Sequence, residues 1–361
     1  MQNELRSYYG VMEGDGAYNR HARLQAGGIA LALPFLEQAA RNITLDGGNQ
    51  PVVIVDYGSS QGKNSLAPMR TAIAALRARL APDRPISVVH VDQVANDFNT
   101  LFDVLHRDPD RYALEDPNIF PSAIGRSFYG SVLPPDSVHL GWSSYAVVWL
   151  SRVPTLIPGH IVGFRGSAEV RAAFERQAAE DWESFLSLRA RELRPGGRLV
   201  VVLPGLNDGG LTGFESLFDE ANAALAEMVD EGVITAGERE GMALAGFPRL
   251  RSDLLAPFAR NGHFRGLAAE HCELSALPDA AWAEYERDGN KEMLAARHAR
   301  FFRTAFAPSL ASALNGAADA VVCQAFADRL EDVLKRRMVN QPQPLHTFVQ
   351  TIVLAKRGFC A

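Results

Sequence analysis

Continuous apolar runs alternate with glycine turns and amphipathic stretches over the first 205 residues of the chain. Residues 52–57 (VVIVDY) form such a run, the turn GSSQGKN follows, and residues 66–80 then carry apolar side chains at a spacing of three to four. This pattern predicts a strand, a tight turn and a helix. Further strands are predicted at residues 86–92, 137–142 and 198–204. Runs that are apolar throughout are typical of parallel strands covered on both faces.

A long amphipathic segment, residues 174–193, precedes the last of these strands. Its large apolar residues at helical spacing are Phe174, Trp182, Phe185, Leu186 and Leu193. The sequence Pro195-Gly196-Gly197 predicts that this helix ends in a turn that leads into the strand.

The pattern changes after about residue 207. Residues 214–340 are mostly helix-like and rich in Ala and Leu, and residues 346–357 predict a late strand. We therefore expect an α/β core formed by residues 1–207 and 341–361 and a mostly helical cap formed by residues 208–340. No internal repeat and no long linker divides the chain further.

The composition is typical of a soluble globular protein. Of the 361 residues, 47% are hydrophobic and 22% charged, and the formal net charge is -6. Proteins that bind nucleic acid normally carry a basic surplus, so this class is disfavoured. Cys272, Cys323 and Cys360 are far apart in sequence and odd in number, which predicts neither a disulfide framework nor a C-x-x-C metal pair. Without a signal sequence or a long apolar run, the chain is expected to be cytoplasmic and not to span a membrane.

The turn after the first predicted strand has the features of a cofactor loop. Asp56 ends that strand, and Gly58 and Gly62 let a ligand approach the backbone. The spacing differs from G-x-G-x-x-G, which disfavours a nicotinamide cofactor. Asp92 ends the second strand, where a carboxylate can accept both hydroxyls of a ribose. This combination suits S-adenosylmethionine (SAM), which has a ribose but no pyrophosphate.

Five segments, taken together, carry a more specific signal. They are MEGDGAYNRHARLQ (12–25), VDYGSSQGKNS (55–65), VDQVANDFNTLF (91–102), IGRSFYGSVLPPDSVHLGWSSYAVVWLSRVP (124–154) and FLSLRARELRPGGRLVVVLPG (185–205). In this order they resemble the salicylate, benzoate and theobromine (SABATH) methyltransferases, which use SAM and mostly methylate small carboxylic acids. The resemblance implies a Rossmann-like SAM-dependent methyltransferase core with a helical cap, SAM as cofactor and a homodimer.

The resemblance also places the cofactor-binding residues. They are Tyr18 near the methionine portion, Gly58, Ser59 and Asn64 in the glycine loop, the ribose-binding Asp92, Gln93 beside it where the family usually has leucine, and Ser127 and Phe128 beside the adenine. From residue type alone, Tyr18 and Phe128 would be core aromatics and Asn64 a helix cap.

Gln25 and Trp149 are the pair that the resemblance assigns to the substrate carboxylate, and Tyr145, Val148 and Phe218 complete the implied pocket. Glutamine and tryptophan supply N–H donors and carry no charge that would repel an anion. Gln25 follows Tyr18 by seven residues, two turns along the same predicted helix. A carboxylic acid is already ionised at neutral pH, so positioning and not a general base is expected to carry the catalysis.

Departures from the family pattern limit what can be said of the substrate. Trp142 and Val148 replace residues that are usual in plant members, and the smaller Val148 leaves room for a bulky aromatic acid or an alkyl chain. Residues 240–248 (EGMALAGFP) lack the acid and asparagine of a metal-associated segment, so no metal is predicted. The Ala- and Arg-rich composition is typical of a bacterial member.

The main hypothesis is a SAM-dependent O-methyltransferase that esterifies a small aromatic or fatty carboxylic acid. An N-methyltransferase of a purine-like heterocycle and a non-catalytic protein that binds SAM or S-adenosylhomocysteine (SAH) remain the alternatives. A nicotinamide oxidoreductase is disfavoured by the spacing of the turn.

Overall fold

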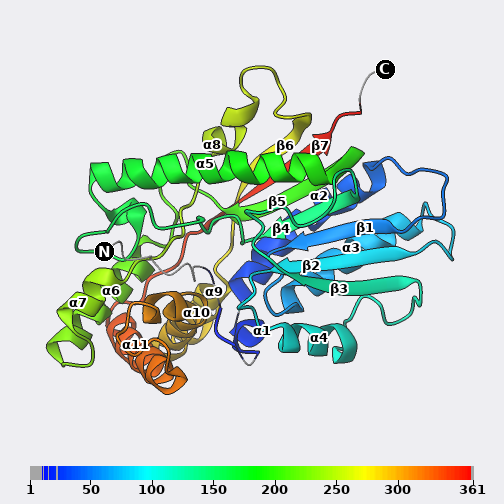
Figure 1. The fold of residues 1–361 in the computed structure, drawn as a ribbon. Coiled ribbons are helices and arrows are strands. Elements are labelled where there is room, and N and C mark those ends of the chain that lie inside the picture. The colour runs from blue at the N-terminus through cyan, green and yellow to red at the C-terminus, as the bar shows by residue number, and fades with distance from the viewer. Residues whose placement is uncertain (1–9, 11, 15, 22, 359–361) are drawn as a thin grey trace.

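A seven-stranded sheet forms the centre of the computed structural model (Figure 1). The structure describes residues 10, 12–14, 16–21 and 23–358, without the side chains of Tyr18, His21 and Arg23. The strand order is β3-β2-β1-β4-β5-β7-β6. The first five strands pair in parallel, whereas β7 is antiparallel to both of its neighbours.

The strands are β1 (Val52–Tyr57), β2 (Ile86–Asp92), β3 (Ile119–Gly125), β4 (Val138–Ser144), β5 (Leu193–Pro204), β6 (Leu267–Ala276) and β7 (Phe348–Lys356). The five strands predicted from apolar runs are confirmed as β1, β2, β4, β5 and β7. All five have strand neighbours on both sides, and their central residues are buried.

The sequence pattern missed the two strands at the edges of the sheet, β3 and β6. Phe120, Pro121 and Ser122 of β3 are exposed, and only Leu267 of β6 is fully buried. An edge strand needs no continuous apolar run because part of its surface faces solvent. Since β6 belongs to the sheet, the range 208–340 is not all cap. The remaining boundaries between core and cap stay predictions.

Helices cover both faces of the sheet. On one face lie α2 (Arg23–Asn42) and α3 (Leu66–Arg77), and on the other lies α5 (Ala168–Glu192) (Figure 1). Both predicted helices, at 66–80 and 174–193, are confirmed. The predicted turn at Pro195-Gly196-Gly197 is wrong, because α5 ends at Glu192 and these residues already belong to β5, where the register with β4 shifts. The stretch forms an irregularity inside the strand.

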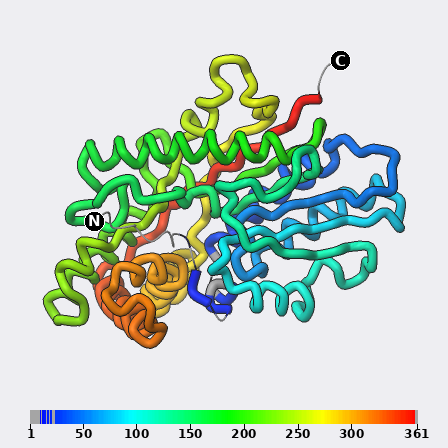
Figure 2. The backbone as a smooth tube through the Cα atoms, in the orientation of Figure 1, coloured from blue at the N-terminus to red at the C-terminus, as the bar shows by residue number. Residues whose placement is uncertain are grey.

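The other helices are α1 (Ala17–His21), α4 (Phe98–Arg107), α6 (Glu215–Asp230), α7 (Ala236–Gly241), α8 (Arg251–Leu255), α9 (Ala280–Asp288), α10 (Lys291–Ala311) and α11 (Ala320–Asn340). Helices α6, α10 and α11 pack around a hydrophobic core of their own, apart from the two layers beside the sheet (Figure 2). Among the described residues, no helix combines the length and the apolar character needed to cross a membrane.

Candidate active site

Two adjoining cavities lie where the parallel strands end. The strand-end cavity is lined by Gly10, Met12, Gly58, Ser60, Asp92, Gln93, Asn96, Phe128, Ser144, Tyr145, Ala146 and Trp149. The aromatic cavity is lined by Met12, Leu24, Gln25, Tyr145, Val148, Trp149, Val162, Phe164, Pro204, Thr212, Phe214, Phe218, Leu244, Gly246, Pro248, Phe301, Ala305 and Phe306. Because Met12, Tyr145 and Trp149 border both, the cavities share a wall.

A smaller space, the inner recess, adjoins both cavities. It is lined by Gln25, Ile29, Gly58, Ser59, Ser60, Asn64, Ser65, Ser144 and Tyr145. Gly58 and Ser60 also belong to the strand-end cavity, and Gln25 also belongs to the aromatic cavity. The inner recess therefore lies between the glycine loop and the substrate side of the site.

The glycine loop after β1 is fixed by its backbone. The N–H groups of Gly58 and Ser59 donate to the carbonyl of Val91, at 2.7 and 3.1 Å. Gly58 has φ of 89°, and a Cβ at this position would lie 2.1 Å from the Cβ of Ala146. Only glycine satisfies both conditions. The loop thereby stays close to the end of β2 and leaves the strand-end cavity open.

Asp92, at the end of β2, is held by two backbone donors. Its carboxylate accepts from the N–H of Ser60 at 2.6 Å and from the N–H of Gln93 at 2.8 Å. Burial raises its pKa to about 6; the two backbone hydrogen bonds lower it and the nearby Asp56 charge raises it. Each carboxylate oxygen keeps a lone pair for a further donor. The group is thus oriented to accept hydroxyls from a ligand in the cavity.

The structure brings most of the predicted cofactor residues together. Gly58, Asp92, Gln93 and Phe128 line the strand-end cavity, and Ser59 and Asn64 line the inner recess with Gly58. Ser127 is exposed and belongs to none of the three linings, and its hydroxyl accepts from the N–H of Tyr129.

Tyr18 lies in α1, and its side chain is outside the described part of the chain. Gln25 lies in α2, on the other side of residue 22, which is also not described. The prediction that Tyr18 and Gln25 share one face of a helix therefore stays untested.

Sequence reasoning missed Asn96, whose side chain donates to the carbonyl of Ser60 at 2.9 Å and lines the strand-end cavity. Asn96 lies four residues after Asp92 in the segment VDQVANDF, and this position was the available signal. Met12 was missed as well, although it borders both cavities.

All five predicted substrate residues, Gln25, Tyr145, Val148, Trp149 and Phe218, line the aromatic cavity. Gln25 is buried, and its Oε1 has no hydrogen-bond partner among the described residues. Buried polar atoms usually have a partner, so this unpaired amide can turn either its oxygen or its NH₂ group toward a ligand in the cavity.

The cap supplies an aromatic wall. Phe218 of α6 packs edge-on against Phe164 at 5.6 Å between ring centroids and lies 5.2 Å from Phe306 of α10. Trp149 lies 5.9 Å from the ring of Phe306. Of the described residues that line this cavity, none is charged. The lining of the cavity is therefore mostly apolar, with a few polar groups from Gln25, Tyr145, Trp149 and Thr212. This is the composition expected for a small-molecule site.

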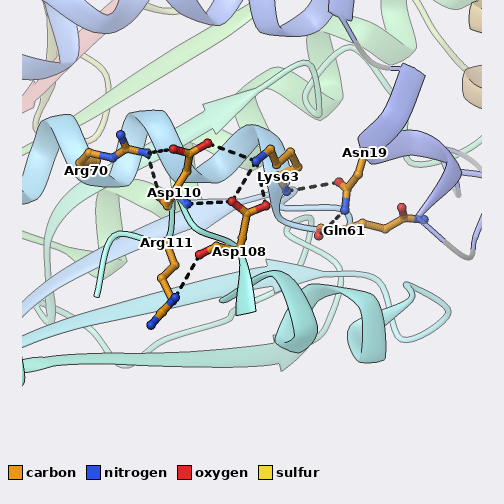
Figure 3. Close-up of polar contacts among 7 residues, drawn as sticks. All are labelled: Asn19, Gln61, Lys63, Arg70, Asp108, Asp110 and Arg111. Atoms are coloured by element: carbon orange, nitrogen blue, oxygen red, sulfur yellow. Dashed lines mark hydrogen bonds and ion pairs between the residues drawn. The ribbon is translucent and has the colours of Figure 1, made fainter. Parts of the chain in front are cut away.

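The N-terminal segment joins the cap to the glycine loop. The carboxylate of Glu13 forms an ion pair with Arg303 of α10 at 3.0 Å. The backbone carbonyl of Glu13 accepts a hydrogen bond from the side chain of Gln61 at 2.7 Å. Asn19 of α1 contacts the loop again through the carbonyl of Gln61 and the N–H of Lys63 (Figure 3). Gly10, at one end of this segment, packs on the indole of Trp149. Gly10 and Met12 therefore lie at the shared wall of the two cavities.

Lys63 anchors the loop from the opposite side. Its ammonium contacts Asp108 at 2.8 Å and Asp110 at 3.4 Å, and Asp110 also pairs with Arg70 of α3 (Figure 3). These groups are partly exposed, so each pair contributes little to the free energy of unfolding. Their geometry nevertheless holds the end of the loop, where the chain enters α3. In the described part of the chain, no three His, Cys, Asp or Glu side chains are grouped closely enough to hold a metal ion.

Comparison with known proteins gives one family. A family model described as "SAM dependent carboxyl methyltransferase" matches residues 7–357. Methyltransferase LUC1 of Fusarium sp is 34% identical over 227 residues, which cover 62% of this chain and 59% of LUC1. Loganic acid O-methyltransferase of Catharanthus roseus is 31% identical over 241 residues, which cover 60% of this chain and 62% of that protein.

A solved structure shows the same fold. The structure titled "Loganic acid methyltransferase with SAH" superposes with a TM-score of 0.76 and 23% identity, and the match covers 96% of this chain and 99% of the other. The predicted Rossmann-like methyltransferase fold is thereby confirmed. The family model also confirms, at the level of the family, the predicted enzyme class and SAM as its cofactor.

The sequence matches span only about three fifths of the length of these curated relatives. The relatives are fungal and plant proteins, so the bacterial type stays a prediction. The cytoplasmic location and the homodimer also stay predictions.

Proposed function

Because this chain belongs to the family of SAM-dependent carboxyl methyltransferases, we propose that it transfers the methyl group of SAM to the carboxylate of a small hydrophobic acid, giving the methyl ester and SAH. The observation that carries the proposal is the wall between the two cavities. Trp149, a donor suited to a carboxylate, lies on that wall between an apolar cavity and a cavity that fits a nucleoside, and Gln25 lies beside it, between the aromatic cavity and the inner recess.

The residues of the strand-end cavity and the inner recess fit SAM. Asp92 is oriented to accept ribose hydroxyls, and Gln93 and Phe128 lie on the same wall for the base. In the inner recess, the hydroxyl of Ser59 and the amide nitrogen of Asn64 have no hydrogen-bond partner among the described residues, which suits the polar amino-acid end of SAM.

The aromatic cavity fits the substrate. Gln25 and Trp149 can both donate N–H groups to a carboxylate, and the phenylalanines of the cap would surround an apolar body. The aromatic lining, which has no charged member among the described residues, together with the valine at position 148 supports an aromatic, terpenoid or fatty acid over a small polar one.

When bound, SAM supplies an electrophilic methyl group on a positively charged sulfur. The residues have only to orient the acid, because its carboxylate is ionised at neutral pH and needs no general base. Orienting the attacking oxygen can contribute about 7–11 kcal/mol relative to a bimolecular encounter. The N-terminal segment and the phenylalanine wall would exclude water from the carboxylate, which weakens its solvation and favours the transfer.

The ionisation of Asp92 makes cofactor binding pH-dependent. Since burial raises the pKa of Asp92 to about 6, the carboxylate is ionised at pH 7.5 and increasingly protonated below pH 6, where it loses acceptor capacity for ribose hydroxyls. We expect the Kd for SAH to be constant above about pH 7 and to rise toward about tenfold per pH unit below pH 6. Calorimetric titration with SAH between pH 5 and pH 8.5 measures this, and a Kd that stays flat down to pH 5 would contradict the assignment.

Val148 is expected to set the size of the acid that the aromatic cavity accepts. In Val148→Phe the larger ring would occupy the cavity, while the backbone carbonyl of residue 148 could still accept from the N–H of Phe247. We expect kcat/KM for dodecanoic acid to fall about tenfold or more relative to that for benzoic acid. An unchanged ratio, measured with the two acids in competition, would show that residue 148 does not limit the cavity.

A methyl-transfer screen tests the proposed function directly. The purified chain is incubated with labelled SAM and benzoic, loganic, terpenoid and fatty acids, and products are identified by mass spectrometry. An ester regenerates the free acid on mild base hydrolysis, which separates carboxyl methylation from N-methylation of a purine-like heterocycle included in the panel. Binding of SAH without transfer to any acid would contradict the proposal and support the non-catalytic alternative.

A further inference from the structure

Two consecutive residues that follow β4 each press against a glycine of another element. A Cβ at Gly58 would lie 2.1 Å from the Cβ of Ala146, and a Cβ at Gly28 would lie 1.9 Å from the hydroxyl oxygen of Tyr145. Both distances are far below any normal contact between heavy atoms. The segment after β4 therefore fits only because residues 58 and 28 have no side chain.

The backbone at Tyr145 fixes the base of its side chain. Its φ of 56° is in the left-handed region, which non-glycine residues rarely adopt. Its N–H donates to the carbonyl of Val202 in β5 at 2.7 Å. With the base of the side chain fixed in this way, the neighbours of the ring decide where the hydroxyl lies.

Gly28 lies in α2 three residues after Gln25, on the same side of the helix. Tyr145 lines the strand-end cavity, the aromatic cavity and the inner recess, and none of the other described residues lines all three. Tyr145, which packs against Gly28, therefore separates the strand-end cavity, the aromatic cavity and the inner recess from one another.

We propose that Gly28 is a positioning residue: its missing side chain lets Tyr145 lie against α2 and so keeps the strand-end cavity open for the cofactor. The inference rests on the proposed function, since it concerns the same site. Gly28 destabilises the helix, because glycine in a helix interior is less favourable than alanine. Its neighbour Gly27 has the same effect, but a Cβ there would meet only the flexible end of Leu277 at 3.2 Å.

Gly28→Ala and its matched control Gly27→Ala test the proposal through SAH binding, measured by calorimetry. Both gain the same helix propensity, so neither melting temperature should fall by more than a few degrees. In Gly28→Ala the ring of Tyr145 must move toward the cavities, and the Kd for SAH is expected to rise about tenfold or more. In Gly27→Ala it should stay within about twofold of the wild type. Equal Kd values in the two variants would overturn the proposal.

Removing the tyrosine hydroxyl gives a second, independent test. In the Tyr145→Phe background the closest atom to a Cβ at residue 28 becomes the ring Cζ at 2.9 Å. The effect of Gly28→Ala on the Kd for SAH should therefore be at least about threefold smaller in this background. A loss of affinity that is the same in both backgrounds would mean that residue 28 acts on the site without Tyr145, which overturns the proposal.

The two hypotheses fail differently. A wild-type chain that binds no SAH contradicts the proposed function, whatever the variants do. Whether Gly28 sets the position of Tyr145 is then tested by a crystal structure of Gly28→Ala. A hydroxyl displaced by about 1 Å or more supports the inference, because a Cβ 1.9 Å away cannot be accommodated otherwise, and an undisplaced hydroxyl overturns it.

Discussion

Replacing Gln25 with glutamate is expected to lower kcat/KM for carboxylic acids about 10³-fold. Gln25 is buried in α2 on the wall of the aromatic cavity, where a carboxylate would receive its N–H groups. A glutamate of nearly the same shape would bring a second negative charge to that place. Two like charges about 4 Å apart repel by about 4 kcal/mol at the effective dielectric of a partly enclosed site. The substrate must carry its charge in order to react, and burial raises the pKa of the carboxyl introduced at residue 25, so the full loss is expected at alkaline pH, where both groups are ionised.

Gln25→Met separates the charge from the lost hydrogen bond. Methionine keeps the length of the side chain but donates nothing, so kcat/KM is expected to fall by only about 10- to 30-fold. Steady-state kinetics with saturating SAM at alkaline pH on both variants gives the comparison. If glutamate and methionine reduce kcat/KM equally, no anionic group lies next to residue 25, and the N-methyltransferase alternative becomes the better explanation.

The residues that the sequence predicted well are those whose role is visible in a short segment. The apolar run of residues 52–57 and the acids at the end of the first two strands located β1, β2 and the cofactor side of the site. The edge strands β3 and β6 could not be found in this way, since their side chains are only partly buried and leave no continuous apolar run. Ser127 was placed by resemblance at the adenine, yet the structure leaves it exposed and outside the lining.

The features of the site that could not be predicted from the sequence depend on contacts between distant segments. Phe218 was expected in the pocket, but its partners Phe164 and Phe306 come from segments 54 and 88 residues away. No periodicity links such residues, because only the packing of α6 against α10 and against the segment between β4 and α5 brings them together. The role of Gly28 could not be predicted from the sequence either, since the reason for a glycine inside a helix is clear only when the residue that packs against it is known.

Asp92→Asn is expected to weaken SAH binding by about 10²- to 10⁴-fold. The carboxylate accepts from the N–H groups of Ser60 and Gln93 and keeps lone pairs for two ribose hydroxyls. Asparagine has one acceptor oxygen, so its NH₂ group would face either a backbone N–H of the loop or a ribose hydroxyl. Each lost hydrogen bond to a charged acceptor is worth about 1.5–3 kcal/mol, and at least two are affected. Calorimetry with SAH at pH 7.5 measures the loss.

The pH profile distinguishes a direct role of Asp92 from a general disturbance of the loop. An asparagine side chain does not titrate, so the rise in the Kd for SAH that the wild type should show below pH 6 is expected to disappear in Asp92→Asn. Asp97→Asn serves as the control, because Asp97 caps α4 nearby without lining the strand-end cavity and asparagine caps helices equally well. Its Kd should stay within about threefold of the wild type and keep the same pH dependence. If Asp97→Asn loses as much affinity as Asp92→Asn, the loop geometry and not the Asp92 carboxylate governs cofactor binding.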